Sequence, residues 1–210
     1  MSLPAQQPMV HPQATETSFD MNSISVMSIF GGDKPWSAVD WVRTDDTVRG
    51  GASVSELTIN GTPPTAIFHG KLVKKLGEAA FASQRTTRED RNWDLSTYEG
   101  LVLDIAKSDE KQYTLTLKDA VLPPNPNGTD PASLTWQYDF KVKLDGEKVL
   151  IKWDTFKPTL KGREQKDAKP LDLKHVKRIG FMNRSFFGSQ EGNFSLSINS
   201  LSAYRNVTAK

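Results

Sequence analysis

Three histidines are the only side chains of this sequence that could supply an imidazole base near neutral pH. They are His11, His69 and His175, and the sequence places no orienting carboxylate beside them in the pattern of a catalytic triad. The chain contains no cysteine, which excludes thiol catalysis, disulfides and thiolate metal sites. It also lacks a nucleophile elbow and a glycine-rich phosphate loop. The sequence therefore predicts no catalytic site and no cofactor.

Two pairs of adjacent acidic residues remain as candidates for acid–base or cation chemistry, Asp45-Asp46 and Glu89-Asp90. Paired carboxylates can flank a glycosidic bond or bind calcium. Adjacent carboxylates more often lie in solvated turns, so we expect no metal site and a protein that is not an enzyme. A hydrolase acting through Asp45, Asp46 or Glu89 is the third-ranked hypothesis.

Aromatic side chains offer a second kind of chemistry, because tryptophan faces stack on sugar rings. Trp136 and Trp153 fall on apolar strand faces and are assigned to the core, whereas Trp36, Trp41 and Trp93 are the candidates for exposure. If they are exposed, the protein could be a carbohydrate-binding or small-ligand-binding module. This is the alternative function that the residues themselves support.

The charge balance limits the partners. With 27 Lys and Arg against 25 Asp and Glu, the net charge is +2, which predicts no nucleic-acid binding. A basic stretch that includes Lys161, Arg163 and Lys166 could contact an acidic partner or an anionic lipid surface, although acidic residues interrupt it and favour a solvated face.

The elements that must position these residues are strands. Apolar and polar residues alternate most clearly over 134–142, and the same period of two recurs at 101–105, 113–117, 149–153 and 194–198. Weaker candidates raise the total to ten or eleven short strands. The best helical segment, 71–83, is split by Gly77, and 170–177 is the only other candidate. The pattern predicts an all-β sandwich or jelly roll with at most one or two short helices and with long loops at 122–132 and 157–169.

The predicted domain organisation is a flexible N-terminal tail at 1–24, a β-sandwich domain at 25–206 and a C-terminal tail at 207–210. Residues 1–33 contain no Lys or Arg, which is not typical of a secretory or mitochondrial targeting segment.

A series of motifs resembles the complex I intermediate-associated protein 30 family. The first is 41–53, in which Trp41 and Asp46 precede the sequence Gly50-Gly51-Ala52-Ser53. Further matching blocks follow in the family's order at 68–70, 77–86, 94–101, 153–162, 179–181 and 192–196. The resemblance covers about residues 28–205.

This resemblance implies a galactose-binding-like β-sandwich that acts without catalysis as an assembly factor, or chaperone, for mitochondrial respiratory complex I. The implied partners are complex I assembly intermediates and other assembly factors. Because no presequence is recognisable, a cytoplasmic paralogue with a different protein client is an alternative.

The candidate partner-binding residues come from the motifs. Gly50 and Gly51 permit a tight turn that could place Asp46 and Ser53 near backbone donors, with either a structural or a partner-contact role. Arg85 could clamp a carboxylate, either internally with Asp46 or across an interface. The remaining candidates are Thr86, Phe156, Lys157, Pro158, Thr159, Lys161 and Gly162.

Overall fold

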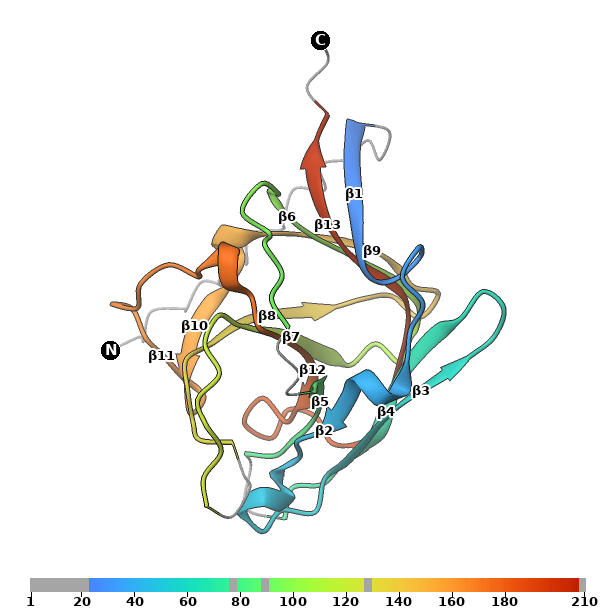
Figure 1. Ribbon diagram of the computed structural model, residues 1–210. Helices are drawn as coiled ribbons and strands as arrows, with labels where there is room; N and C mark the ends of the chain where they lie inside the picture. The colour runs from blue at the N-terminus through green and yellow to red at the C-terminus, as the bar shows by residue number, and fades with distance from the viewer. Residues whose placement is uncertain (1–22, 76–78, 88–90, 127–129, 208–210) are drawn as a thin grey trace, which may run out of the picture.

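The computed structural model describes residues 23–75, 79–87, 91–126 and 130–207. These residues form two packed antiparallel sheets, which confirms the predicted all-β sandwich (Figure 1). The predicted N-terminal tail lies almost wholly outside the described residues, as do Gly77 and the Glu89-Asp90 pair. No helix in the described ranges is long and apolar enough to span a membrane.

The six-stranded sheet has the order β3-β4-β13-β6-β9, and β1 pairs with a second part of β13. Its strands are β1 (Ile24–Gly31), β3 (Val54–Asn60), β4 (Thr65–Leu72), β6 (Gly100–Ser108), β9 (Glu147–Lys152) and β13 (Gly192–Asn206). β13 is 15 residues long, and one edge of it is shared by two partners. β4 pairs with it up to Ile198 and β1 pairs from Ser200 onward, so the register changes at Asn199.

The seven-stranded sheet has the order β11-β10-β8-β7-β12-β5-β2. Its strands are β2 (Trp41–Arg43), β5 (Phe81–Thr86), β7 (Gln112–Lys118), β8 (Thr135–Lys141), β10 (Lys157–Leu160), β11 (Arg163–Glu164) and β12 (Arg178–Arg184). The apolar residues of the alternation predicted from sequence are the ones that the strands bury in the core. Tyr113, Leu115 and Leu117 of β7 point inward and are fully buried, while Thr116 and Lys118 lie on the outer face.

The described helical segments are four short 3₁₀ turns: η2 (Ala38–Asp40), η3 (Asp46–Arg49), η4 (Trp153–Thr155) and η5 (Leu173–His175). The segment with the best helix propensity, 71–83, instead contains the end of β4 and the start of β5. The expectation of one long loop at 157–169 was wrong, because β10 and β11 pair there as a hairpin. Trp153 lies in η4 and is only partly buried, and its indole N–H donates to the Tyr98 carbonyl at 2.6 Å.

Candidate binding surfaces

The Gly50-Gly51 turn holds a buried carboxylate. Asp46 accepts hydrogen bonds from the backbone N–H of Ser53 at 2.9 Å, from the Ser53 hydroxyl at 2.8 Å and from the N–H of Phe81 at 3.2 Å. Gly50 adopts a left-handed conformation with φ of 88°. A side chain at Gly51 would overlap the Asp46 carboxylate. The buried Asp46 side chain therefore links η3 to the start of β3 and to the start of β5.

The neighbouring Asp45 has an equivalent structural role. Its carboxylate accepts from the N–H of Ser55 at 3.0 Å, from the Ser55 hydroxyl at 2.6 Å and from the N–H of Ser83 at 2.8 Å. Burial raises the pKa of Asp45, while the hydrogen bonds from Ser55 and Ser83 act in the opposite direction. Both members of the acidic pair are buried rather than solvated, which corrects the expectation of a solvated turn.

The other candidate residues are distributed between the core and the surface. Thr86, Phe156 and Thr159 are buried, and the Thr159 hydroxyl donates to the Thr135 carbonyl at 3.0 Å. Lys161 and Gly162 are exposed at the tip of the β10–β11 hairpin. Partner contact through the motif residues stays a prediction.

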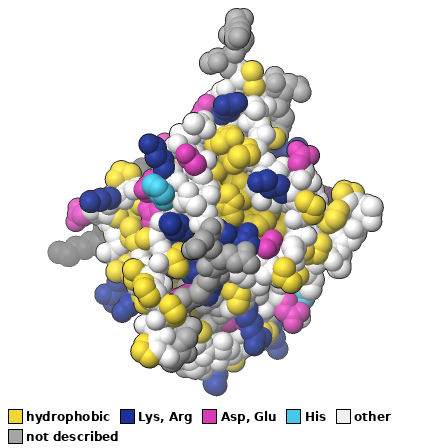
Figure 2. All heavy atoms as spheres, viewed as in Figure 1, with side chains coloured by type: hydrophobic (Ala, Val, Ile, Leu, Met, Phe, Trp, Pro, Cys, Tyr) yellow, Lys and Arg dark blue, Asp and Glu magenta, His cyan; other side chains and the backbone are white. Residues whose placement is uncertain are grey.

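The seven-stranded sheet brings two of the predicted segments onto one outer face. In register across it lie Val42, Arg85, Gly180, Thr116, Gln137 and Lys157. Arg85 of β5 and Lys157 of β10, which are 72 residues apart in the sequence (157 minus 85), therefore share a surface. Several Lys and Arg side chains appear near the middle of the view in Figure 2, where β5 and β12 lie in Figure 1.

A group of three cations and one carboxylate, which we call the cationic cluster, occupies this face. It consists of Arg85 on β5, Arg178 on β12, Lys118 on β7 and Asp130 in the β7–β8 connection. Asp130 Oδ2 lies 2.7 Å from Arg85 Nη2 and 2.7 Å from Arg178 Nη1. Arg85 therefore clamps an internal carboxylate, as one alternative held, but the carboxylate belongs to Asp130 and not to Asp46.

Lys118 is the unusual member of the cationic cluster. It lies directly opposite Arg178 in the β7–β12 register, and its ammonium donates to the Ser133 hydroxyl at 2.8 Å. Burial, together with the charges of Arg178 and Arg85, lowers the pKa of Lys118 to about 8. The alternation of β7 could have placed Lys118 on the outer face from sequence alone. Nothing local in the sequence points to Asp130.

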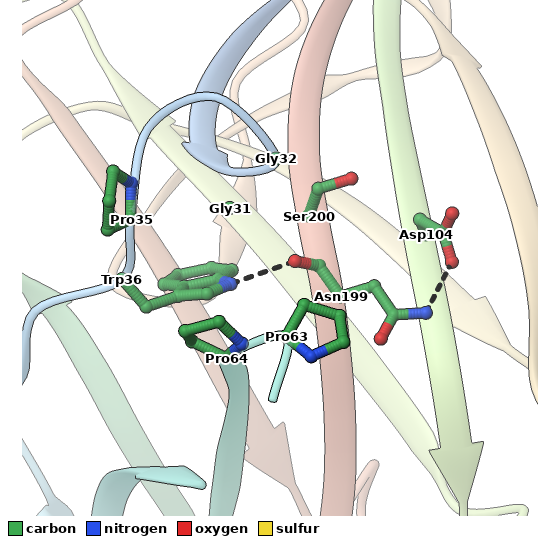
Figure 3. A pocket seen from close by; sticks show the side chains of 9 residues that line it. All are labelled: Gly31, Gly32, Pro35, Trp36, Pro63, Pro64, Asp104, Asn199 and Ser200. Carbon is green, nitrogen blue, oxygen red and sulfur yellow. Dashed lines mark hydrogen bonds between the residues drawn. The ribbon is translucent and has the colours of Figure 1, made fainter. Parts of the chain in front are cut away.

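A shallow hollow of about 370 Å³ lies on the other sheet, where β1 and β4 meet along β13 (Figure 3). Prolines 35, 63 and 64 form its apolar wall, and Asp104, Asn199 and Ser200 form its polar side. The Trp36 indole N–H donates to the Asn199 carbonyl at 2.9 Å, and the Asn199 amide donates to Asp104 at 2.9 Å. The Trp36 bond satisfies the backbone carbonyl of Asn199, where the register of β13 changes, and the Asp104 bond fixes the Asn199 side chain.

The tryptophan platform considered in the sequence analysis is not formed by the described residues. Trp36 and Trp41 are buried, with exposures of 5% and 7%, and Trp93 is partly buried. Phe30 lies against all three rings, with centroid distances of 5.0 to 5.9 Å. The aromatic rings therefore pack with one another instead of offering a face to a sugar.

One histidine does have a carboxylate partner. His175 Nδ1 lies 2.8 Å from Asp172 Oδ2 at η5, a pair that the sequence analysis did not anticipate. Both side chains are more than half exposed, and no third catalytic group joins them among the contacts of the described residues. Within the same residues, no cluster of three or more potential metal ligands occurs.

The β12–β13 connection carries an exposed and strained aromatic residue. Phe186 and Phe187 both have positive φ, 44° and 58°, and Phe187 is 85% exposed. Gln190 holds this loop, since its amide donates to the carbonyls of Arg184 at 2.7 Å and Gln112 at 2.8 Å. A left-handed backbone conformation in a bulky residue costs conformational energy, and residues strained in this way are concentrated at functional sites.

Replacing Phe187 with glycine is expected to stabilise the protein by about 1 kcal/mol, because glycine adopts positive φ without steric strain. The free energy of unfolding in urea would measure this. Phe187→Ala is the matched control, because it removes the ring and keeps the strain. Equal stabilities of the two variants would contradict the strain argument.

The architecture is shared with known sugar-binding domains. It matches a family 11 carbohydrate-binding module of the Clostridium thermocellum cellulase Lic26A-Cel5E with a TM-score of 0.58 and 14% identity, covering 85% of this chain and 94% of the module. The same type of module in complex with a mixed-linked tetrasaccharide matches with a TM-score of 0.54 and 16% identity, covering 86% and 94% of the two chains. The protein is thus a β-sandwich of the jelly-roll class, and at these identities the likeness concerns the fold alone.

The sequence comparisons then define the family. The family model for complex I intermediate-associated protein 30 matches residues 15–198, so this chain belongs to that family. A Schizosaccharomyces pombe protein described as uncharacterized is 38% identical over 184 residues, which cover 85% of this chain and 84% of the relative. The family predicted from the ordered motifs is confirmed.

Proposed function

We propose that this protein is a non-enzymatic assembly factor for respiratory complex I that binds assembly intermediates in the mitochondrion. Family membership is the observation that carries the proposal. The described structure is consistent with it, because its paired carboxylates are engaged in internal hydrogen bonds and its only histidine–carboxylate pair is exposed and isolated.

The proposed contact surface is the outer face of the seven-stranded sheet. Arg85, Lys157 and the hairpin tip at Lys161 and Gly162 belong to this sheet, and Lys157, Lys161 and Gly162 are exposed members of the predicted motif residues. Charged side chains on such a face set the specificity and rate of association more than its affinity. The predicted contact of the basic hairpin with anionic lipid is a further, separate proposal.

Affinity capture of tagged protein from mitochondrial and cytosolic fractions, followed by mass spectrometry, tests this function. We expect complex I subunits and other assembly factors in the mitochondrial pool. Lys157→Glu should lower their recovery several-fold, because it reverses a charge on the contact face. Lys107→Glu on the exposed outer face of β6 is the control and should leave recovery unchanged.

A cytosolic pool with unrelated protein partners would contradict this assignment and support the paralogue alternative. The carbohydrate-binding alternative is supported by the fold alone, since Trp36 and Trp41 are buried.

A further inference from the structure

The cationic cluster concentrates positive charge where β5, β12 and β7 lie side by side. Arg178 has a side-chain exposure of 5% and Arg85 one of 18%, so both guanidinium groups are largely withdrawn from water. Lys118 faces Arg178 directly across the β7–β12 ladder. Like charges in directly opposed positions destabilise a sheet, so folding alone does not account for a lysine at this position.

The cluster pairs its carboxylate with the two arginines and not with Lys118. Asp130 is its one carboxylate, and the same oxygen, Oδ2, receives both arginines. Lys118 has no acidic group within 4 Å among the described residues, and its one hydrogen bond goes to the neutral Ser133 hydroxyl. A partly buried cation without a counter-charge is a candidate functional group, because its environment favours an arriving anion.

We propose that the cationic cluster recognises the carboxylate side chains of an acidic peptide segment in a partner protein, with Lys118 as the group that receives the incoming carboxylate. Asp130 shows the chemistry that fits, since its carboxylate already bridges two guanidinium groups at this site. The inference rests on the proposed function only in supposing that the acidic segment belongs to a protein client.

A second feature of the same face favours a peptide over a free inorganic anion. Gln137 lies opposite Thr116 in the β7–β8 register, two residues along the ladder from Lys118, and its Oε1 is buried without a hydrogen-bond donor. An unsatisfied buried acceptor is costly. Because this oxygen is buried, an external donor reaches it only when the Gln137 side chain turns outward. A peptide supplies backbone N–H donors for it as well as carboxylates for the cations, whereas phosphate at neutral pH offers mainly acceptors.

Fluorescence anisotropy with a labelled peptide of alternating glutamate and serine tests the proposal on the purified full chain. We expect Lys118→Met to weaken binding about tenfold, the size expected for the loss of one charge-assisted contact. Lys107→Glu, on the exposed face of β6 in the other sheet, is the control for non-specific charge effects. It changes the net charge more than Lys118→Met does, yet it should weaken binding less.

The pH dependence provides a second readout. Binding by the wild type should fall as the pH rises from 7 to 9, because Lys118 loses its proton in this range. The charged groups around it are Arg85 and Arg178, Asp130, which bridges these two arginines, and Asp119, which is next to it in the chain. Lys118→Met should show no such decline.

Two competitors are added to the labelled peptide bound to the protein: inorganic phosphate and the same acidic peptide without label. Stronger competition by phosphate than by an equal concentration of peptide carboxylates would overturn the assignment to a peptide. An equal loss of binding in Lys107→Glu and in Lys118→Met would overturn the assignment to the cluster. Both results come from purified protein, so they are independent of whether complex I subunits are captured from cells.

Discussion

Gly51→Ala is expected to destabilise the protein by about 3 kcal/mol, the range of severe single substitutions. The added Cβ would overlap the Asp46 carboxylate and lie 2.9 Å from Asp46 Cβ. Asp46 cannot move away without losing its hydrogen bonds from Ser53 and Phe81, which join η3 to β3 and β5. Unfolding in urea followed by tryptophan fluorescence would measure the loss of stability.

Gly50→Ala is the matched control for this prediction. Gly50 has positive φ, but a Cβ added there meets no atom within 4 Å. Its cost is therefore the conformational strain alone, about 1 kcal/mol. If Gly51→Ala lost no more stability than Gly50→Ala, the close approach to Asp46 would not be the reason for the second glycine.

Lys118→Met is expected to have the opposite effect on stability, raising it by about 1 to 2 kcal/mol at pH 7. Methionine fills a similar volume, carries no charge and removes the repulsion from Arg178 and Arg85. The lost hydrogen bond to Ser133 and the remaining solvent contact of Lys118 reduce the gain. A stabilised variant that also loses peptide binding would identify Lys118 as a residue retained for function.

The sign of the pH dependence follows from the direction of the shift. The pKa of Lys118 is about 8 in the folded protein, below its ordinary value of 10.5, so the unfolded chain binds more protons between these two values. Stability of the wild type relative to Lys118→Met should therefore increase as the pH rises from 8 to 10.5. The advantage of methionine is largest below pH 8. A pH-independent difference between the two proteins would show that charge is not the cause.

The strands could be predicted from sequence because burial of one sheet face leaves a local signature. The alternation through Tyr113, Leu115 and Leu117 is read directly from adjacent residues. The β10–β11 hairpin was missed because β11 is only two residues long. Its residues, Arg163 and Glu164, are both polar, so they give no alternation of polar and apolar residues. The buried tryptophans were misjudged because Trp36 and Trp41 meet Phe30 through contacts between separate elements.

The candidate site was predictable only in part, for the same reason. Arg85 was selected as a residue that could clamp a carboxylate, and it does so. Its partner, Asp130, lies in a proline-rich connection 45 residues away (130 minus 85), and its position depends on how that connection returns to the sheet. Long-range ion pairs of this kind carry no periodic or local sequence signal.

The shared edge of β13 determines when the protein can fold. β13 is the pairing partner of β1, β4 and β6, and Ile24 of β1 pairs with Asn206 of β13, 182 residues later in the sequence (206 minus 24). The six-stranded sheet consequently cannot close while the ribosome still holds residues 192–206. Folding of this sheet is dominated by non-local pairing, which makes it slow. Removal of β13 would leave three other strands without their common neighbour.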